Sequence, residues 1–226
     1  MPAYFQMGHD SENLVGIEGL ERFAGIVLSP VNRSEVTLKD DVKSFRDKGR
    51  FDILFDPQLY CPQSERGRLT SHGYFPNDLD TADPSSDAWW RELVKRLAEE
   101  ANRLNVDGLC TPAILPKKYT PDYYSRCADS YSRLVAELSE TAIRPIMTIC
   151  LSLKELTDPS EALRIASIVT AFNPQNSYVV VEAEIEPRRE IADAVNLFGL
   201  MVLIHALEKN GCRTLVSHCS SDMVLM

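Results

Sequence analysis

Short apolar segments of strand length recur along the chain, and this recurrence is the feature that most restricts its fold. Each segment is rich in aliphatic or β-branched residues and has the length of a buried β-strand. A longer stretch with room for a helix separates most segments from the next. The six segments are Phe23–Pro30, Phe51–Pro57, Val106–Pro112, Arg144–Ser152, Tyr178–Ile185 and Arg213–Cys219. The sequence therefore predicts six strands that alternate with helices.

The stretches between these segments carry helical signals. In Thr120–Thr141 the apolar residues follow the spacing of one helical face. Proline follows Thr120, Asp158 and Glu186, and the first helical position favours its fixed φ and needs no N–H. Ser86 is a candidate N-cap before a further apolar repeat. Because consecutive parallel strands need a crossover helix, this order predicts a parallel sheet covered by helices.

Two α/β folds satisfy this order, the open doubly wound sheet and the (β/α)8 barrel. Residues 29–36 (SPVNRSEV), after the first predicted strand, contain no glycine, and the chain has no GxxxxGK[ST] stretch. We therefore expect no NAD, FAD or nucleotide-loop cofactor. Over almost the whole chain the repeats resemble the TIM-barrel superfold, without the motif of any specific family. We expect parallel-stranded β-α repeats forming an incomplete or partner-completed (β/α)8 barrel, with the open doubly wound sheet as the alternative.

The sequence is interpreted as one α/β domain over residues 1–226. Residues 1–20 form an N-terminal extension in this interpretation, and residues 57–83 form a long loop after the second strand. A closed barrel has eight strands, so we expect the last two β-α units to be missing. Since an incomplete barrel exposes strand edges, we expect a homo-oligomer or a partner chain that completes the barrel. Leu197–Leu207, apolar nearly all round, fits a helix buried on more than one side.

Charge and hydropathy argue against several kinds of partner. The formal net charge of −9 at pH 7 would repel phosphate backbones and anionic membrane surfaces. The N-terminal segment is too polar for a signal peptide, and the longest apolar run, Leu197–Ile204, is too short to span a membrane. The six cysteines contain no CxxC pair. We expect a cytoplasmic protein with reduced thiols and a small-molecule substrate.

Carboxylates stand at the ends of two predicted strands. In parallel β-α folds, ligands and catalytic residues gather at the carboxyl ends of the strands. Strand alternation places Asp56 on the face away from the helices, with Gln58 above it, and gives Glu182 and Glu184 one shared face. Buried carboxylates can bind a divalent metal, or divide into an acid and a base or nucleophile. The structural alternative is that Glu182 pairs with an arginine and that Glu184 is solvated at the rim.

His218 is the third candidate. If Leu215 faces the helices, Val216 and His218 face inward. This arrangement puts His218 near the level of Glu182, as a metal ligand or as a general acid or base. Asp56, Glu182 and His218 are therefore the predicted catalytic residues and the predicted ligands of a metal, if one is bound.

The loop of residues 57–83 is long enough to form a lid or a binding loop. Its Arg66, Arg68 and His72 suit a phosphate or carboxylate, and Lys117 adds a charge from the loop after the third strand. The predicted substrate-binding residues are Gln58, Arg66, Arg68, Glu184 and Lys117. The alternative is a solvated loop held together by its own aromatic residues.

Three function hypotheses remain. The leading one is a TIM-barrel-like enzyme that uses strand-end carboxylates on a small polar or anionic substrate. Paired carboxylates suit hydrolysis or transfer at a glycosidic bond, and metal-assisted lyase or isomerase chemistry suits the same residues. The second is a non-catalytic subunit or scaffold of a larger assembly. The third, a nucleic-acid-modifying component, would need Arg66, Arg68, Lys117 and Lys118 to line one stripe.

Overall fold

The computed structural model describes residues 3–8, 22–49, 51–83, 86–182 and 193–217. The chain divides into two compact units. Unit 1 comprises Met1–Pro112 and Arg133–Pro145, and unit 2 comprises Ala113–Ser132 and Ile146–Met226. Two predicted site residues, Glu184 and His218, and the predicted helix start at Glu186 lie outside the described residues.

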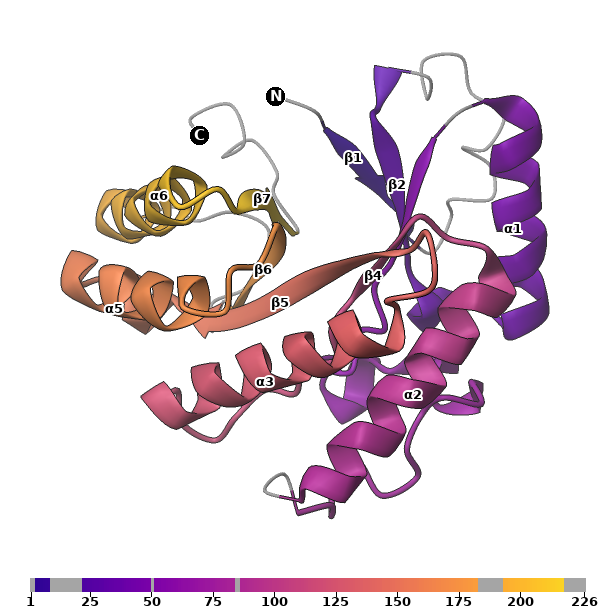
Figure 1. Cartoon of the computed structure of the whole chain (residues 1–226), viewed down its shortest axis with the longest axis horizontal. Helices are drawn as coiled ribbons and strands as arrows, with labels where there is room; N and C mark the ends of the chain where they lie inside the picture. Colours follow the sequence, from indigo (N-terminus) through magenta and orange to yellow (C-terminus); the bar gives the residue numbers. More distant parts are fainter. Residues whose placement is uncertain (1–2, 9–21, 50, 84–85, 183–192, 218–226) are drawn as a thin grey trace. The chain divides into compact units, whose positions relative to one another are not determined.

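Parallel strands β1 to β4 form the sheet of unit 1, in which β1 pairs with β2, β2 with β3 and β3 with β4 (Figure 1). Gly25 of β2 is in register with Tyr4 on one side and Asp52 on the other. Helix α1 connects β2 to β3, and α2 connects β3 to β4. The bounds are β1 (Tyr4–Gln6), β2 (Gly25–Leu28), α1 (Glu35–Lys48), β3 (Asp52–Phe55), α2 (Asp87–Leu104) and β4 (Gly108–Cys110). Short 3-10 helices are η3 (Pro30–Asn32), η4 (Gln63–Glu65) and η5 (Gly67–Ser71).

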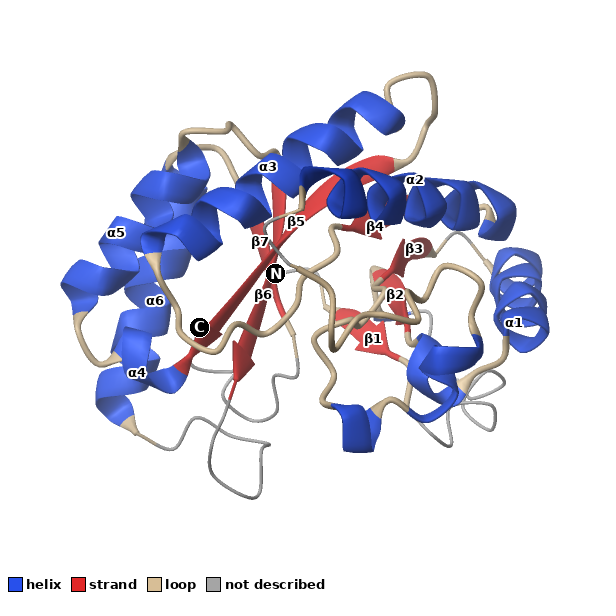
Figure 2. Cartoon of the chain, turned by 90° about the horizontal axis from the view of Figure 1, so that it is seen from below, coloured by secondary structure: helices blue, strands red, loops and turns tan. Residues whose placement is uncertain are grey.

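Unit 2 repeats the same pattern with β5, β6 and β7. Ser152 at the end of β5 is in register with Glu182 at the end of β6, and Asn176 of β6 is in register with Arg213 of β7. Figure 2 shows the helices and strands by colour. The bounds are α3 (Pro121–Glu137), β5 (Arg144–Ser152), α4 (Leu153–Leu156), α5 (Pro159–Thr170), β6 (Asn176–Glu182), α6 (Ala194–Lys209) and β7 (Arg213–Val216).

The strand order follows the sequence in each unit, β1-β2-β3-β4 and then β5-β6-β7. A doubly wound sheet reverses its order at a switch point, whereas successive β-α units of a TIM barrel lie side by side. The predicted parallel β-α fold of TIM-barrel type is therefore confirmed, with seven strands among the described residues rather than the eight of a closed barrel. All six predicted strands are present, and the seventh, β1, lies in the segment interpreted as an N-terminal extension.

Three predicted helix starts are confirmed. The Ser86 hydroxyl accepts a hydrogen bond from the backbone N–H three residues later (3.4 Å), and the Thr120 hydroxyl does the same at 3.2 Å. The Asp158 carboxylate accepts from the N–H two residues later (2.8 Å). Each oxygen satisfies one of the N–H groups that the first helical turn leaves free.

The core of unit 2 lies between its sheet and its helices. Met147, Ile149 and Leu151 of β5 and Val179 of β6 belong to one buried cluster with residues of α3, α5 and α6. Alternate strand residues therefore face the helices. Because Val181 also packs against this cluster, the alternation predicted for the strand that carries Glu182 is confirmed.

The alternation predicted for the last strand is wrong. Val216 packs against the same helix-side cluster, and it is in register with Val179 of that cluster. Val216 therefore faces the helices and Leu215 faces the opposite side. The sequence could not distinguish the two faces, because both residues are large and apolar. The prediction that His218 faces inward loses its basis.

Helix α6 has one buried and one exposed apolar face. Leu200, Leu203 and Leu207 are fully buried, whereas Phe198 is 55% exposed and Met201 is 42% exposed. Within the described residues the helix is thus covered on one side. No helix of the described residues combines the length and the apolar character needed to cross a membrane.

Candidate active site

Asp56 directly follows the last residue of β3 and is only 1% exposed. Its Oδ2 accepts a hydrogen bond from the Tyr60 hydroxyl (2.5 Å), and its Oδ1 accepts one from the backbone N–H of Gln58 (3.1 Å). These two contacts hold the carboxyl group of Asp56 in one orientation. A carboxylate in this state can accept a proton, attack an electrophile or bind a cation.

Gln58 connects the ends of two neighbouring strands. Its Oε1 accepts a hydrogen bond from the hydroxyl of Ser29 (2.8 Å), which directly follows β2. The backbone of Gln58 has a φ of 52°, a left-handed conformation that costs a non-glycine residue about 1 kcal/mol or more. The bonds to Asp56 and Ser29 hold this conformation. Ser29, Gln58 and Asp56 therefore form one buried polar network at the carboxyl ends of β2 and β3.

The charge of Asp56 acts on the groups around it. Burial, followed by the Asp56 charge, raises the pKa of the Cys61 thiol to about 12. The same two causes raise the pKa of Cys110 and of Tyr74 well above their ordinary values. Since the thiolate is the reactive form of cysteine, the raised pKa disfavours the reactive form of Cys61 and Cys110 at neutral pH. Asp56 is thus the chemically competent group of this network.

Glu182 lies at the end of β6 in unit 2 and is half-buried. Its Oε2 accepts a hydrogen bond from the Tyr119 hydroxyl (2.8 Å). Because Glu182 is in register with Ser152, both lie on the face of the sheet that the helix-side cluster leaves free. In the described part of the chain Glu182 pairs with tyrosine, and no arginine bonds to it.

Tyr119, the partner of Glu182, also contacts two other tyrosine rings. The ring centroid of Tyr119 lies 5.5 Å from that of Tyr123 and 6.4 Å from that of Tyr124. Burial, followed by the hydrogen bond to Glu182, raises the pKa of Tyr119. Tyr119 therefore stays a neutral hydrogen-bond donor to the carboxylate. Lys117, two residues before it, is exposed.

Arg66 of the loop 57–83 is already paired within the loop. Its two terminal nitrogens donate to the two carboxylate oxygens of Asp80, each at 2.7 Å, and its guanidinium lies 5.6 Å from the centroid of the Phe75 ring. This bidentate geometry occupies the part of the guanidinium that would bind an anion. Arg68 is exposed, so its role in anion binding stays a prediction.

A hollow of about 270 Å³ lies elsewhere in unit 1. The residues that line it are Pro76, Asn77, Asp78, Trp89, Glu92, Leu93 and Arg96. None of the sequence-predicted site residues is among them, so the hollow gives those residues no additional support.

The structure brings two predicted residues together, Asp56 and Gln58, and adds two that the sequence reasoning missed. Ser29 directly follows β2, just as Asp56 directly follows β3. The carboxyl ends of neighbouring parallel strands lie side by side. That shared position could have identified Ser29. Tyr60 was not among the predicted site residues, although it stands only four residues after Asp56 and its hydroxyl reaches that carboxyl group.

No protein-family profile matches the chain, and no curated protein is significantly similar in sequence. Solved structures that align with it include an AP endonuclease of family 2 from Brucella melitensis, with 14% identity, 96% of this chain and 92% of that chain covered, and a TM-score of 0.46. A sugar phosphate isomerase/epimerase from Parabacteroides distasonis aligns with 12% identity, 95% and 85% coverage and a TM-score of 0.47. A structure of the tryptophan synthase α2β2 complex from Pyrococcus furiosus aligns with 13% identity, 96% and 87% coverage and a TM-score of 0.46. With TM-scores below 0.5, the fold assignment rests on the strand order and the parallel register of this chain.

Proposed function

We propose that the chain is an enzyme of the parallel β/α type that acts on a small polar or anionic substrate through strand-end carboxylates. The observation that carries this proposal is Asp56, a carboxylate 1% exposed at the carboxyl end of β3 and oriented by Tyr60 and Gln58. An ionisable group that is buried and held in one orientation by hydrogen bonds is characteristic of functional sites.

Asp56 and Glu182 take the catalytic roles in this proposal. Asp56 acts as a general base, a nucleophile or a metal ligand, and the hydrogen bonds that both of its oxygens accept orient it for that role. Glu182, with Tyr119 as its hydrogen-bond donor, is the proposed carboxylate of unit 2, and the role of His218, which lies outside the described residues, stays a prediction. Hydrolysis or transfer at a glycosidic bond and metal-assisted lyase or isomerase chemistry both suit these groups, and the second would require a divalent metal.

Substrate contacts are proposed for Gln58, Arg68, Lys117 and Glu184. Gln58 adjoins Asp56 directly, while Arg68 and Lys117 are exposed positive charges in the loops that follow β3 and β4. Arg66 then serves to organise the loop through its pair with Asp80, and contacts the substrate only if that pair opens.

The test is an activity screen followed by paired substitutions. The whole chain is assayed against aryl glycosides and sugar phosphates, with and without Mg²⁺ or Mn²⁺. For any activity found, D56N and E182Q are compared with D40N and E137Q, which change exposed carboxylates. We expect the first pair to lower kcat by about a hundredfold or more and the second pair to leave it unchanged. Full activity of D56N would overturn the assignment of Asp56.

A second candidate, a subunit of a larger assembly, is favoured by the exposed face of α6. Val195, Phe198 and Met201 are 53%, 55% and 42% exposed, and their spacing places them along one side of the helix. We propose that this face contacts a second copy of the chain. Light scattering should detect a dimer or a larger species for the wild type, and F198S should shift it toward the monomer. The control is L163S, which changes an exposed leucine of α5 and should leave the oligomeric state unchanged. A monomeric wild-type chain would contradict this candidate.

A further inference from the structure

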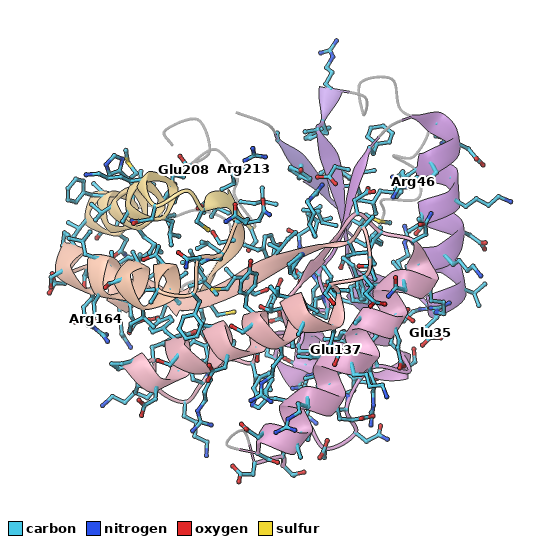
Figure 3. All side chains as sticks on the ribbon, in the orientation of Figure 1. Glu35, Arg46, Glu137, Arg164, Glu208 and Arg213 are labelled. Carbon is cyan, nitrogen blue, oxygen red and sulfur yellow. The ribbon has the colours of Figure 1, made fainter. Side chains whose placement is uncertain are left out.

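Three potential metal ligands that lie far apart in the sequence meet in unit 1. They are Glu35 in the first turn of α1, His72 directly after η5 and Glu100 in α2. One ligand atom from each lies within 4.8 Å of the others. Figure 3 labels Glu35 at the start of α1, with Arg46 near the other end of the same helix. The three segments are neither strand ends nor neighbours in the chain, so this cluster is separate from the Asp56 network.

His72 is presented in the form that binds metals. It is 3% exposed, and its Nε2 lies 2.8 Å from the backbone carbonyl oxygen of Arg33. A carbonyl oxygen only accepts, so Nε2 carries the hydrogen and, in the neutral ring, Nδ1 keeps its lone pair. Metal-binding histidines characteristically use their second nitrogen in this way. Nδ1 has no hydrogen-bond partner in the described part of the chain, which is costly for a buried polar atom.

The two carboxylates are held in place with ligand capacity to spare. Glu35 Oε1 accepts the backbone N–H of Gly73 (2.5 Å), and Glu100 accepts two hydrogen bonds from Arg103 (2.7 and 2.5 Å). A carboxylate offers about four lone pairs, so each can also bind a cation. The guanidinium of Arg103 also lies 3.9 Å from Oε2 of Glu35, so one positive charge faces the two carboxylates and a net negative charge remains beside His72.

A bound ion would satisfy the unused lone pair of His72 Nδ1. This nitrogen lies in hydrogen-bonding geometry with neither Glu35 nor Glu100. A divalent ion about 2.0–2.2 Å from each nitrogen and oxygen ligand requires ligands about 3–4 Å apart, which small side-chain rotations from the present spacing provide. We infer that Glu35, His72 and Glu100 bind a divalent transition metal, Zn²⁺ being the ion of matching ligand preference.

The ion would connect the loop 57–83 to both helices of unit 1. His72 belongs to this loop, and its ring centroid lies 5.5 Å from that of Tyr74, whose hydroxyl donates to the carbonyl oxygen of Pro57 beside Asp56 (3.3 Å). Three protein ligands leave a coordination position for water. The metal therefore stabilises the loop that carries Tyr60, and its binding does not depend on the proposed catalytic activity.

The experiment is a Co²⁺ titration of the metal-stripped full chain, followed by visible absorption and Zn²⁺ competition. We expect one Co²⁺ per chain with the d–d bands of a nitrogen–oxygen site, displacement by Zn²⁺, and a rise in Tm with Zn²⁺ concentration. H72A and E100Q should weaken Co²⁺ binding by about tenfold to a hundredfold or more. H205A and E99Q, which change exposed residues of the same types, should bind as the wild type does.

Two results would overturn the inference. One is a wild-type chain that binds no Co²⁺ or Zn²⁺ and shows no rise in Tm. The other is binding that H72A and E100Q leave intact while their circular dichroism matches the wild type. If both variants unfold, NMR of the wild-type histidines decides, because Zn²⁺ must shift the Nδ1 resonance of His72, and a shift confined to other histidines contradicts the site.

Discussion

The hydroxyl of Tyr60 lies 2.5 Å from Oδ2 of Asp56 and donates a hydrogen bond to it inside unit 1. Both residues are buried, at 8% and 1% exposure. The carboxylate of Asp56 therefore depends on protein donors for much of the stabilisation that water would give an exposed anion. The polar network at the end of β3 has consequences for stability and for the reactivity of a nearby thiol.

Removing the Tyr60 hydroxyl should destabilise the fold. Y60F leaves Oδ2 of Asp56 without this donor, and we expect the free energy of unfolding to fall by about 1.5–3 kcal/mol, as for hydrogen bonds to charged groups. Urea denaturation measures the change. The matched control is Y124F, because the buried Tyr124 hydroxyl has no hydrogen-bond partner in the described residues. If Y60F and Y124F lowered the free energy of unfolding by the same amount, the hydrogen bond to Asp56 would not be the cause.

The charge of Asp56 should control the reactivity of Cys61. Burial, then Asp56, then Glu65 raise the pKa of this thiol to about 12, so its alkylation at mildly alkaline pH should be slow. D56N removes the larger charge effect and should accelerate modification of Cys61 by iodoacetamide more than E65Q does. Peptide mass spectrometry follows the rate at this one cysteine. If E65Q accelerated the modification of Cys61 more than D56N did, Asp56 would not have the larger effect on the pKa of this thiol.

Tyr4 should make stability depend on alkaline pH. Burial, followed by its hydrogen bond to Asp52 (2.5 Å), raises the pKa of Tyr4 from 10.0 to about 12. Because the folded pKa lies above the unfolded one, the stabilisation is complete below pH 10 and is lost as the pH rises toward 12. The wild type should exceed Y4F in stability by a constant margin below pH 10, and this margin should shrink above it. Urea denaturation measures this difference in the free energy of unfolding. A difference that stays the same above pH 10 would exclude a role for the ionisation of Tyr4.

Gly199 should tolerate no side chain. A Cβ at this position of α6 would overlap the carbonyl oxygen of Leu156 in α4, so α6 must move away from α4 to accept alanine. We expect G199A to lower the free energy of unfolding by about 1–3 kcal/mol, seen as a lower Tm. G49A is the control, because its Cβ would only reach ordinary contact with Phe51 at 3.5 Å. A Tm for G199A equal to that of G49A would exclude this close approach.

Local patterns in the sequence predicted most of the secondary structure. The apolar runs became β2 to β7, and the caps at Ser86, Thr120 and Asp158 form the predicted bonds. These signals are local, because they arise from strand alternation and from N–H groups at helix starts. Strand β1 was missed because three residues, Tyr4–Gln6, are too few to show a periodic pattern.

The sites depended on contacts that no local pattern contains. Asp56 was predicted from its place after a strand, whereas the pairing of Arg66 with Asp80, fourteen residues away, follows no local pattern. Val216 was assigned to the wrong face, since only its register with Val179 and its packing against the helices distinguish the two sides.

The sequence by itself determined that this chain forms parallel β-α repeats, because the order of strands and helices and the caps between them are encoded over a few residues each. Only the tertiary structure decided that Ser29 meets Gln58, that Tyr60 bonds to Asp56, and that Glu35, His72 and Glu100 lie together. Such groups meet through the packing of loops on helices and strands, and that packing is determined by shape and burial over the whole unit rather than by neighbours in the sequence.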